Sequence, residues 1–124
     1  MKVKKIDIGI KDLKESLKDF AETWKKVEAG RKVRKEEGIY FDSIDSMRAI
    51  LTNKRLLILK VIKEQKPRSI YELAKTLGRN LKNVNQDLKL LLEVGLVTLE
   101  KTEEDKKRVV PHVHYNKILL EIPV

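Results

Sequence analysis

The strongest constraint on the fold is a set of helix caps and glycines that bounds two consecutive helices. Ser69 stands three residues before Glu72, which is the spacing of a capping box at a helix start. Gly78 suits the left-handed position that ends a short helix. Asn80 is then the N-cap of a longer helix that ends at Gly95. The sequence therefore predicts two helices joined by a tight turn.

A further helix precedes this pair, and strands follow it. Thr52 is a suitable N-cap for the preceding helix, which should end before Pro67 because the residue before a proline disfavours helical backbone. Alternating apolar residues predict strands over residues 96–101, 109–115 and 118–122. We expect the inward apolar residues of these elements to form one core: Leu56, Leu59, Leu73, Leu77, Val84, Leu88, Leu91 and Leu96.

This order of helices followed by a hairpin is that of a winged helix-turn-helix. The expected fold class is mainly α with a small β-wing (α+β), a winged helix-turn-helix with an added N-terminal helix. The inward face of the helix over residues 80–94 should be apolar: Leu81, Val84, Leu88 and Leu91. The opposite face then carries polar and basic side chains: Lys82, Asn83, Gln86 and Lys89, with Asn85 at its margin.

Positive charge is concentrated on the same unit. The formal net charge of the chain is +9, and residues 53–89 contain ten Lys or Arg but only three Asp or Glu. Residues 1–41 contain twelve basic and eight acidic residues, so their charges largely balance. A surplus of this size indicates a polyanionic partner, with nucleic acid as the first candidate and a membrane surface as the second.

Residues 69–78 and 80–97 resemble the winged helix of MarR-like and ArsR-like transcriptional regulators, and most closely that of short archaeal and bacterial DNA-binding proteins of the MarR-like group. The resemblance covers about residues 41–122, including the Leu51-Thr52 pair and the terminal strand. It implies a regulator that binds double-stranded DNA. MarR proteins are longer and build dimers from helices at both ends, and the ArsR-type metal ligands are absent here. No effector is therefore carried over from either family.

The outward face of the helix over residues 80–94 supplies the candidate DNA contacts. We expect base contacts from Lys82, Asn83 and Gln86, because the amides can pair with adenine and the lysine can donate to guanine. We expect backbone contacts from eight other residues: Arg68, Ser69, Tyr71, Arg79, Asn85, Lys89, Lys107 and Arg108. Two alternatives stay open. The helix face could be an ordinary solvated surface. The basic residues at positions 106–108 could instead be neutralised by the acidic residues at positions 103–105.

Residues 1–40 form a separate predicted segment, with residues 41–124 as the winged-helix domain. A short strand is expected near residues 3–8, followed by a long helix over residues 10–37. Apolar residues recur on this helix every three or four positions, which predicts a seam that pairs with a second chain. The expected dimer interface consists of Leu13, Leu17, Phe20, Trp24 and Val27. The alternative is that the helix folds back on its own domain.

Several classes of protein are excluded by composition and motif. The chain has no cysteine, no apolar run long enough for a membrane span and no apolar signal core, so a cytoplasmic protein is expected. It also lacks a Gly-rich phosphate loop and a nucleophile elbow, which argues against an enzyme. His112 and His114 have the spacing of a metal pair, but a polar strand face is the preferred interpretation. No metal or cofactor is expected.

The sequence thus predicts a dimeric, sequence-specific DNA-binding transcriptional regulator, with autoregulation or an antitoxin-like role as further options. The alternative is a winged-helix protein-interaction module, or an RNA-associated protein without sequence-specific DNA binding. RNA recognition favours exposed aromatic residues, and the basic region contains only Tyr71. Neither a protein partner nor an operator follows from the sequence.

Overall fold

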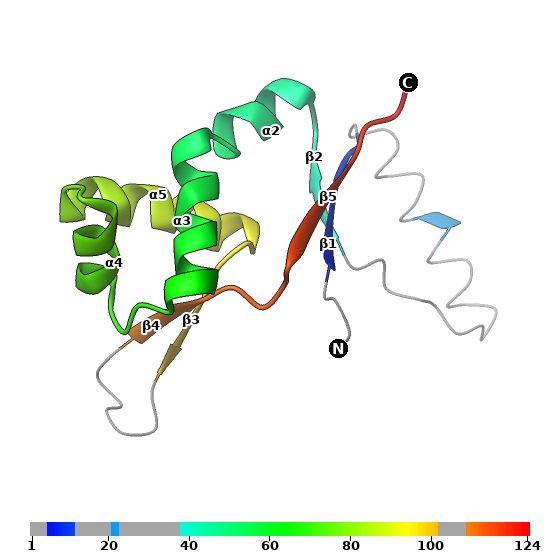
Figure 1. Ribbon diagram of the computed structural model, residues 1–124. Coiled ribbons are helices and arrows are strands. Elements are labelled where there is room, and N and C mark those ends of the chain that lie inside the picture. The colour runs from blue at the N-terminus through cyan, green and yellow to red at the C-terminus, as the bar shows by residue number, and fades with distance from the viewer. Residues whose placement is uncertain (1–4, 12–20, 23–37, 102–108) are drawn as a thin grey trace.

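The computed structural model describes residues 5–11, 21–22, 38–101 and 109–124 (Figure 1). Among these, the helices are α2 (Ile44–Ile50), α3 (Asn53–Gln65), α4 (Ile70–Leu77) and α5 (Leu81–Val94). The strands are β1 (Lys5–Ile10), β2 (Ile39–Phe41), β3 (Thr98–Lys101), β4 (Val109–His112) and β5 (Lys117–Glu121). Helices α3 to α5 followed by the β3–β4 hairpin confirm the predicted winged helix-turn-helix.

Each of the helices α2 to α5 is capped at its start by a polar side chain. The side chains of Ser43, Thr52 and Ser69 each accept a hydrogen bond from the backbone N–H three residues later. Asn80 caps α5 by accepting from the Lys82 N–H at 2.8 Å, which confirms its predicted structural role. These bonds satisfy donors that the first helical turn leaves without partners.

Two glycines end helices α4 and α5. Gly78 follows α4 at φ 64° and Gly95 follows α5 at φ 88°, both in the left-handed region that glycine adopts without strain. Lys66 ends α3 with the same hand, at φ 49°, just before the buried Pro67. The boundaries predicted from these residues are therefore confirmed.

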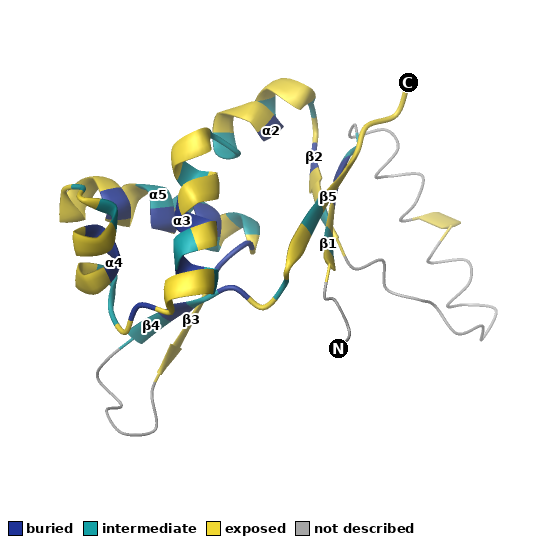
Figure 2. Ribbon diagram, in the orientation of Figure 1, coloured by how far each residue is buried: buried dark blue, intermediate teal, exposed yellow. Residues whose placement is uncertain are grey.

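The core lies where α3, α4 and α5 face one another (Figure 2). It confirms most of the predicted set: Leu59, Leu73, Val84, Leu88, Leu91 and Leu96 are all buried. Two predicted core positions are wrong and one is partly so. Leu56 is 40% exposed and Leu81 is 42% exposed, while Leu77 is half-buried. Leu81 begins α5 and so lies at the margin of the helix packing, and Leu56 borders a groove beside β5.

The wing is a two-stranded antiparallel sheet in which Thr98 pairs with His112 and Lys101 with Val109. Pro111 lies in β4 opposite Leu99, in a hairpin whose two strands pair only with each other among the described residues. The strand ends at His112 and does not continue to Tyr115. Instead, the Tyr115 hydroxyl donates to the Leu96 carbonyl at 2.9 Å and ties the end of the wing to its start.

A second, parallel sheet has the order β2-β1-β5 and was not predicted. Ile8 of β1 is opposite Ile39 of β2 and Leu120 of β5. Because side chains alternate along a strand, these three isoleucine and leucine positions share one face. Ile8 is fully buried in the same core as α3 to α5. The terminal strand is thus not part of the wing but pairs with the start of the chain.

This sheet bears on the proposed division of the chain at residues 40 and 41. Strand β1 precedes that boundary, yet it pairs with β5, which follows it. The division itself stays a prediction. The five residues of the expected dimer interface, Leu13, Leu17, Phe20, Trp24 and Val27, lie outside the described residues.

Candidate nucleic-acid interface

Helix α5 has one buried face and one polar, exposed face. Val84, Leu88 and Leu91 are buried, with at most 1% of their surface exposed. The three predicted base-contacting residues, Lys82, Asn83 and Gln86, are exposed on the helix, and so are Asn85 and Lys89. Their exposure agrees with the predicted surface. The DNA contacts assigned to them stay predictions.

The outer surface of α5 is slightly hollowed between its side chains. Leu81, Lys82, Asn85, Gln86 and Lys89 line this shallow, open hollow. Four of these residues can donate hydrogen bonds or carry charge, and the exposed Leu81 adds an apolar contact. This mixture can meet base edges, phosphates and the methyl group of thymine in a DNA groove.

The start of α4 adds three predicted backbone contacts. Arg68 is exposed, and Tyr71 is 69% exposed with its phenol free to reach a neighbouring molecule. The Ser69 oxygen accepts from the Glu72 N–H at 3.0 Å, so its own O–H is left to donate. These groups are suited to phosphate oxygens, and α4 packs directly against α5.

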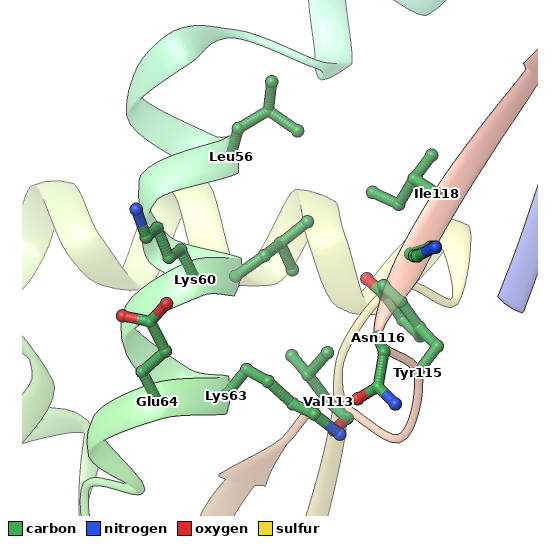
Figure 3. Close-up of a pocket in the computed structure, with 10 residues that line it drawn as sticks. Leu56, Lys60, Lys63, Glu64, Val113, Tyr115, Asn116 and Ile118 are labelled. Atoms are coloured by element: carbon green, nitrogen blue, oxygen red, sulfur yellow. The ribbon is translucent and has the colours of Figure 1, made fainter. Parts of the chain in front are cut away.

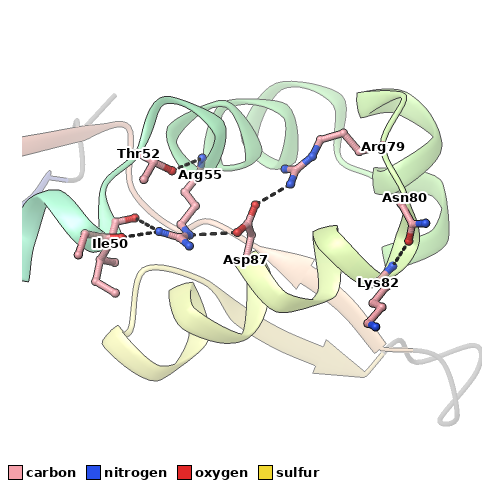
Figure 4. Close-up of polar contacts among 8 residues, drawn as sticks. Ile50, Thr52, Arg55, Arg79, Asn80, Lys82 and Asp87 are labelled. Carbon is pink, nitrogen blue, oxygen red and sulfur yellow. Dashed lines mark hydrogen bonds and ion pairs between the residues drawn. The ribbon is translucent and has the colours of Figure 1, made fainter.

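An ion-pair network that the sequence does not predict holds α5 against α3 and against the turn between α4 and α5 (Figure 4). Asp87 of α5 accepts from Arg55 Nε at 3.2 Å through Oδ1 and from Arg79 Nη2 at 2.9 Å through Oδ2. The three side chains are 14–22% exposed. Arg55 also donates through Nη1 to the carbonyls of Ala49, at 2.6 Å, and Ile50, at 3.2 Å. We call Arg55, Asp87 and Arg79 the arginine clamp.

The arginine clamp gives Arg79 a structural role beside its predicted phosphate contact. Its Nη2 is engaged by Asp87, and its Nη1 is buried without a hydrogen-bond partner among the described residues. The guanidinium therefore points into the protein rather than standing free on the surface. One sequence signal could have revealed the pair, because Asp87 is the sole acid between Glu72 and Glu93.

The hairpin carries a second polar cluster, formed by Glu100, His112 and His114. His114 Nε2 lies 2.5 Å from one Glu100 oxygen, and His112 Nε2 lies 3.5 Å from the other. The two imidazole rings are stacked, with centroids 5.6 Å apart. The hydrogen bond with His114 is the main cause that lowers the pKa of Glu100 below its usual value. Within the described ranges, no group of three or more His, Cys, Asp or Glu is arranged to hold a metal ion.

The base of the wing is fixed to the helices. Lys63 of α3 donates through Nζ to the Val113 carbonyl at 3.3 Å, next to the Tyr115 bond to Leu96. Burial raises the pKa of the Tyr115 phenol, which keeps it protonated as a donor.

The two predicted wing contacts, Lys107 and Arg108, lie outside the described residues. No helix in the part of the chain that is described is long and apolar enough to cross a membrane.

Comparison with known proteins finds solved structures with a similar fold and one matching family. No curated protein matches the chain. Similar solved structures include MarR (22% identity, TM-score 0.44), a MarR-like transcriptional regulator from Thermotoga maritima (17%, 0.48) and a variant of Lactococcus lactis ZitR (20%, 0.48). The alignments cover 56%, 83% and 83% of this chain but only 58%, 65% and 66% of those chains.

A family model of the sequence gives the assignment. The model of the family HVO_A0114 matches residues 50–120, from the end of α2 to β5. This range contains the arginine clamp, the exposed face of α5 and the whole wing. Because the match extends over more than half of the chain, the protein belongs to the HVO_A0114 family.

Proposed function

We propose that the protein binds double-stranded DNA and regulates transcription, with α5 lying in the major groove. The observation that carries this proposal is the outer face of α5, where Lys82, Asn83, Gln86 and Lys89 are all exposed. The opposite face of the same helix is buried, and Asp87 fixes it to α3. A rigid helix with one polar face fits the width of the major groove.

The side chains then have different tasks. Asn83 and Gln86 read adenine through bidentate amide pairs, and Lys82 donates to guanine. Arg68, Ser69, Tyr71, Asn85 and Lys89 contact phosphates and fix the register of the protein on the duplex. Lys107 and Arg108 extend these contacts beside the wing. For Arg79, we propose that its main role is to position α5 through Asp87.

As in the sequence-based prediction, the regulator acts as a homodimer without enzymatic activity in the cytoplasm. Two recognition helices related by a two-fold axis contact half-sites about one DNA turn apart, ~34–36 Å. The N-terminal seam of Leu13, Leu17, Phe20, Trp24 and Val27 is one proposed contact between the chains. Autoregulation of a small operon, or an antitoxin-like role with a bound protein partner, is compatible with this arrangement.

A second candidate is a winged-helix protein-interaction module without sequence-specific DNA binding. The observation in its favour is the exposure of apolar side chains outside α5: Leu57 of α3 is 50% exposed and Leu120 of β5 is 53% exposed. Fold alone does not decide between the two functions. The polar face of α5 and the charge surplus over residues 53–89 favour DNA.

Selection from a pool of random duplexes tests the proposal. The intact protein should enrich one sequence motif, and binding to the selected duplex is then measured by fluorescence anisotropy at several salt concentrations. Asn83→Ala or Gln86→Ala should weaken binding to the selected duplex by ~1–3 kcal/mol and relax the preference at one base pair. Lys89→Ala should weaken all duplexes alike and lower the salt slope by about one unit.

Matched controls come from α3, on exposed positions away from α5. Gln65→Ala is the control for the two amides, and Lys60→Ala is the control for Lys89. Gln65→Ala should leave the affinity and the sequence preference unchanged, and Lys60→Ala should leave the affinity and the salt slope unchanged. Absence of binding to any duplex at low salt contradicts the proposal. So does binding that responds to the controls as strongly as to the α5 variants.

A further inference from the structure

Strand β5 stands at an end of the parallel sheet and presents apolar side chains to solvent. The sheet order is β2-β1-β5, so β5 has a single strand partner in the described part of the chain. Leu119 is 42% exposed, Leu120 is 53% exposed and Ile122, just beyond the strand, is 45% exposed. An exposed apolar edge strand attracts a further strand, and proteins normally cover or charge such an edge.

The same apolar surface continues into a groove between α3 and β5 (Figure 3). The groove has a volume of about 250 Å³, with Leu56 of α3 on one side and Ile118 of β5 on the other. Its lining also includes three lysines: Lys60, Lys63 and Lys117. A strand that is added beside β5 would therefore lie next to an existing apolar surface.

The sequence of β5 is complementary to itself in the antiparallel direction. When two copies are aligned with Leu119 opposite Leu119, Ile118 lies opposite Leu120 and Lys117 lies opposite Glu121. Directly opposed residues in an antiparallel pair share one face, so Ile118 and Leu120 pair on one side, and Lys117 and Glu121 pair on the other side, beside Leu119. Neither Lys117 nor Glu121 makes an ion pair with another described residue.

We propose that β5 pairs antiparallel with β5 of a second copy of this chain, around a two-fold axis at Leu119. The pairing forms two Lys117–Glu121 ion pairs and joins the two sheets into one sheet of six strands. A two-fold axis at this place is an isologous interface, which closes after two chains. The partner's strand covers the exposed Leu120 and satisfies the open backbone edge of β5.

The register of this pairing is well determined by the side chains. A slip of one residue would place Lys117 directly opposite Leu120, or Ile118 directly opposite Glu121, so that a charged side chain faces an apolar one. A slip of two residues keeps the faces but separates Lys117 from Glu121. Two strands of five residues form a small interface, so we expect a weak dimer that dissociates on dilution.

The β5 pairing rests on the proposed function, because its use in the cell is to hold the α5 helices of two chains in a fixed relation on DNA. The interface lies in the described C-terminal strand and does not need the N-terminal seam. Dimerisation is measured without DNA, so failure of the inference and failure of DNA binding are separate results.

A charge-swap experiment tests the pairing by sedimentation equilibrium of the intact chain. Lys117→Glu brings acids opposite Glu121, and Glu121→Lys brings lysines opposite Lys117. Because opposed like charges on a sheet repel, each variant should raise the dimer dissociation constant about five-fold or more. A one-to-one mixture of the two variants, one of them labelled with ¹⁵N, should form a heterodimer in native mass spectrometry, and the double variant should regain the original dissociation constant.

Lys75→Glu is the matched control, because it changes the net charge equally on the exposed surface of α4. It should leave the dissociation constant unchanged, and circular dichroism should show all variants folded. The inference is overturned if the chain is a monomer at tens of micromolar. It is also overturned if the swaps act no more than the control, or if Trp24→Glu alone abolishes a dimer that the swaps do not affect.

Discussion

The helix pair α4–α5 and the parallel sheet β2-β1-β5 share one core, but the sequence specifies them in different ways. The ends of α4 and α5 are set by residues adjacent to each helix: Ser69, Gly78, Asn80 and Gly95. The sheet instead combines residues 5–10, 39–41 and 117–121, which lie far apart in the chain. Local rules are therefore sufficient for the first region and insufficient for the second.

The difference follows from where the hydrogen bonds of each region are made. A helix satisfies its backbone within its own segment, so caps and period are visible in a short window. A strand satisfies its backbone on another strand, which need not be near in sequence. The two regions also present different surfaces, since α5 is polar outside whereas β5 is apolar at its edge. We assign the first surface to DNA and the second to another copy of the chain.

The largest expected effect is in the core beneath α5. Leu88 is 1% exposed, and Leu88→Ala removes a buried side chain and leaves a cavity. The free energy of unfolding should fall by ~2–5 kcal/mol, measured by urea denaturation. Leu57→Ala, at a half-exposed position on α3, is the control and should cost far less. An equal loss in the two variants would contradict the assigned inner face of α5.

Ile8→Ala should be about as costly, and it decides whether sheet and helices are one unit. Ile8 is fully buried in the core that also contains Leu88. We therefore expect a loss of ~2–5 kcal/mol in the same cooperative transition that reports on α5. If residues 1–40 were a separate arm, Ile8→Ala would leave the unfolding of α5 unchanged. That result would contradict a core shared by the parallel sheet and the helices.

The arginine clamp should have a smaller effect on stability and a clear one on DNA binding. Asp87→Ala leaves Arg55 and Arg79 without their shared acceptor, at positions that retain some contact with water. We expect a cost of about 1–3 kcal/mol in unfolding and weaker binding to the selected duplex, although Asp87 itself faces away from it. Glu93→Ala, at an exposed position on the same helix, is the control. Unchanged binding in Asp87→Ala would show that the clamp does not position α5.

The smallest expected effect concerns Glu100 in the wing. Its pKa is lowered mainly by the His114 hydrogen bond, so the ionised carboxylate stabilises the folded wing. That contribution is present above the pKa of the unfolded chain and is lost as the pH falls through the lower folded pKa. A carboxyl NMR titration should show Glu100 titrating below its usual value of 4.5, and His114→Ala should move it back up. If Glu100 of the unaltered protein titrates at its usual pKa, the proposed interaction of Glu100 with His114 is contradicted.

Much of the polar outer face of α5 could be predicted from sequence, whereas the long-range contacts could not. The caps Thr52, Ser69 and Asn80 are predictable because each acts within four residues of itself. The periodicity of α5 identified its inner face, but it could not show that Leu81 lies beyond the packing. The contact between Arg55 and Asp87 joins residues 32 apart, and no local pattern specifies it.

The central claim is that the outer face of α5 contacts double-stranded DNA. The most direct measurement is an NMR titration of the ¹⁵N-labelled chain with the selected duplex at low salt. We predict the largest changes in amide chemical shift at residues 82–89 of α5 and at Tyr71 of α4, with the control residue Gln65 of α3 unchanged. Changes centred on β5, or none at α5 while the duplex is bound, would contradict the assignment.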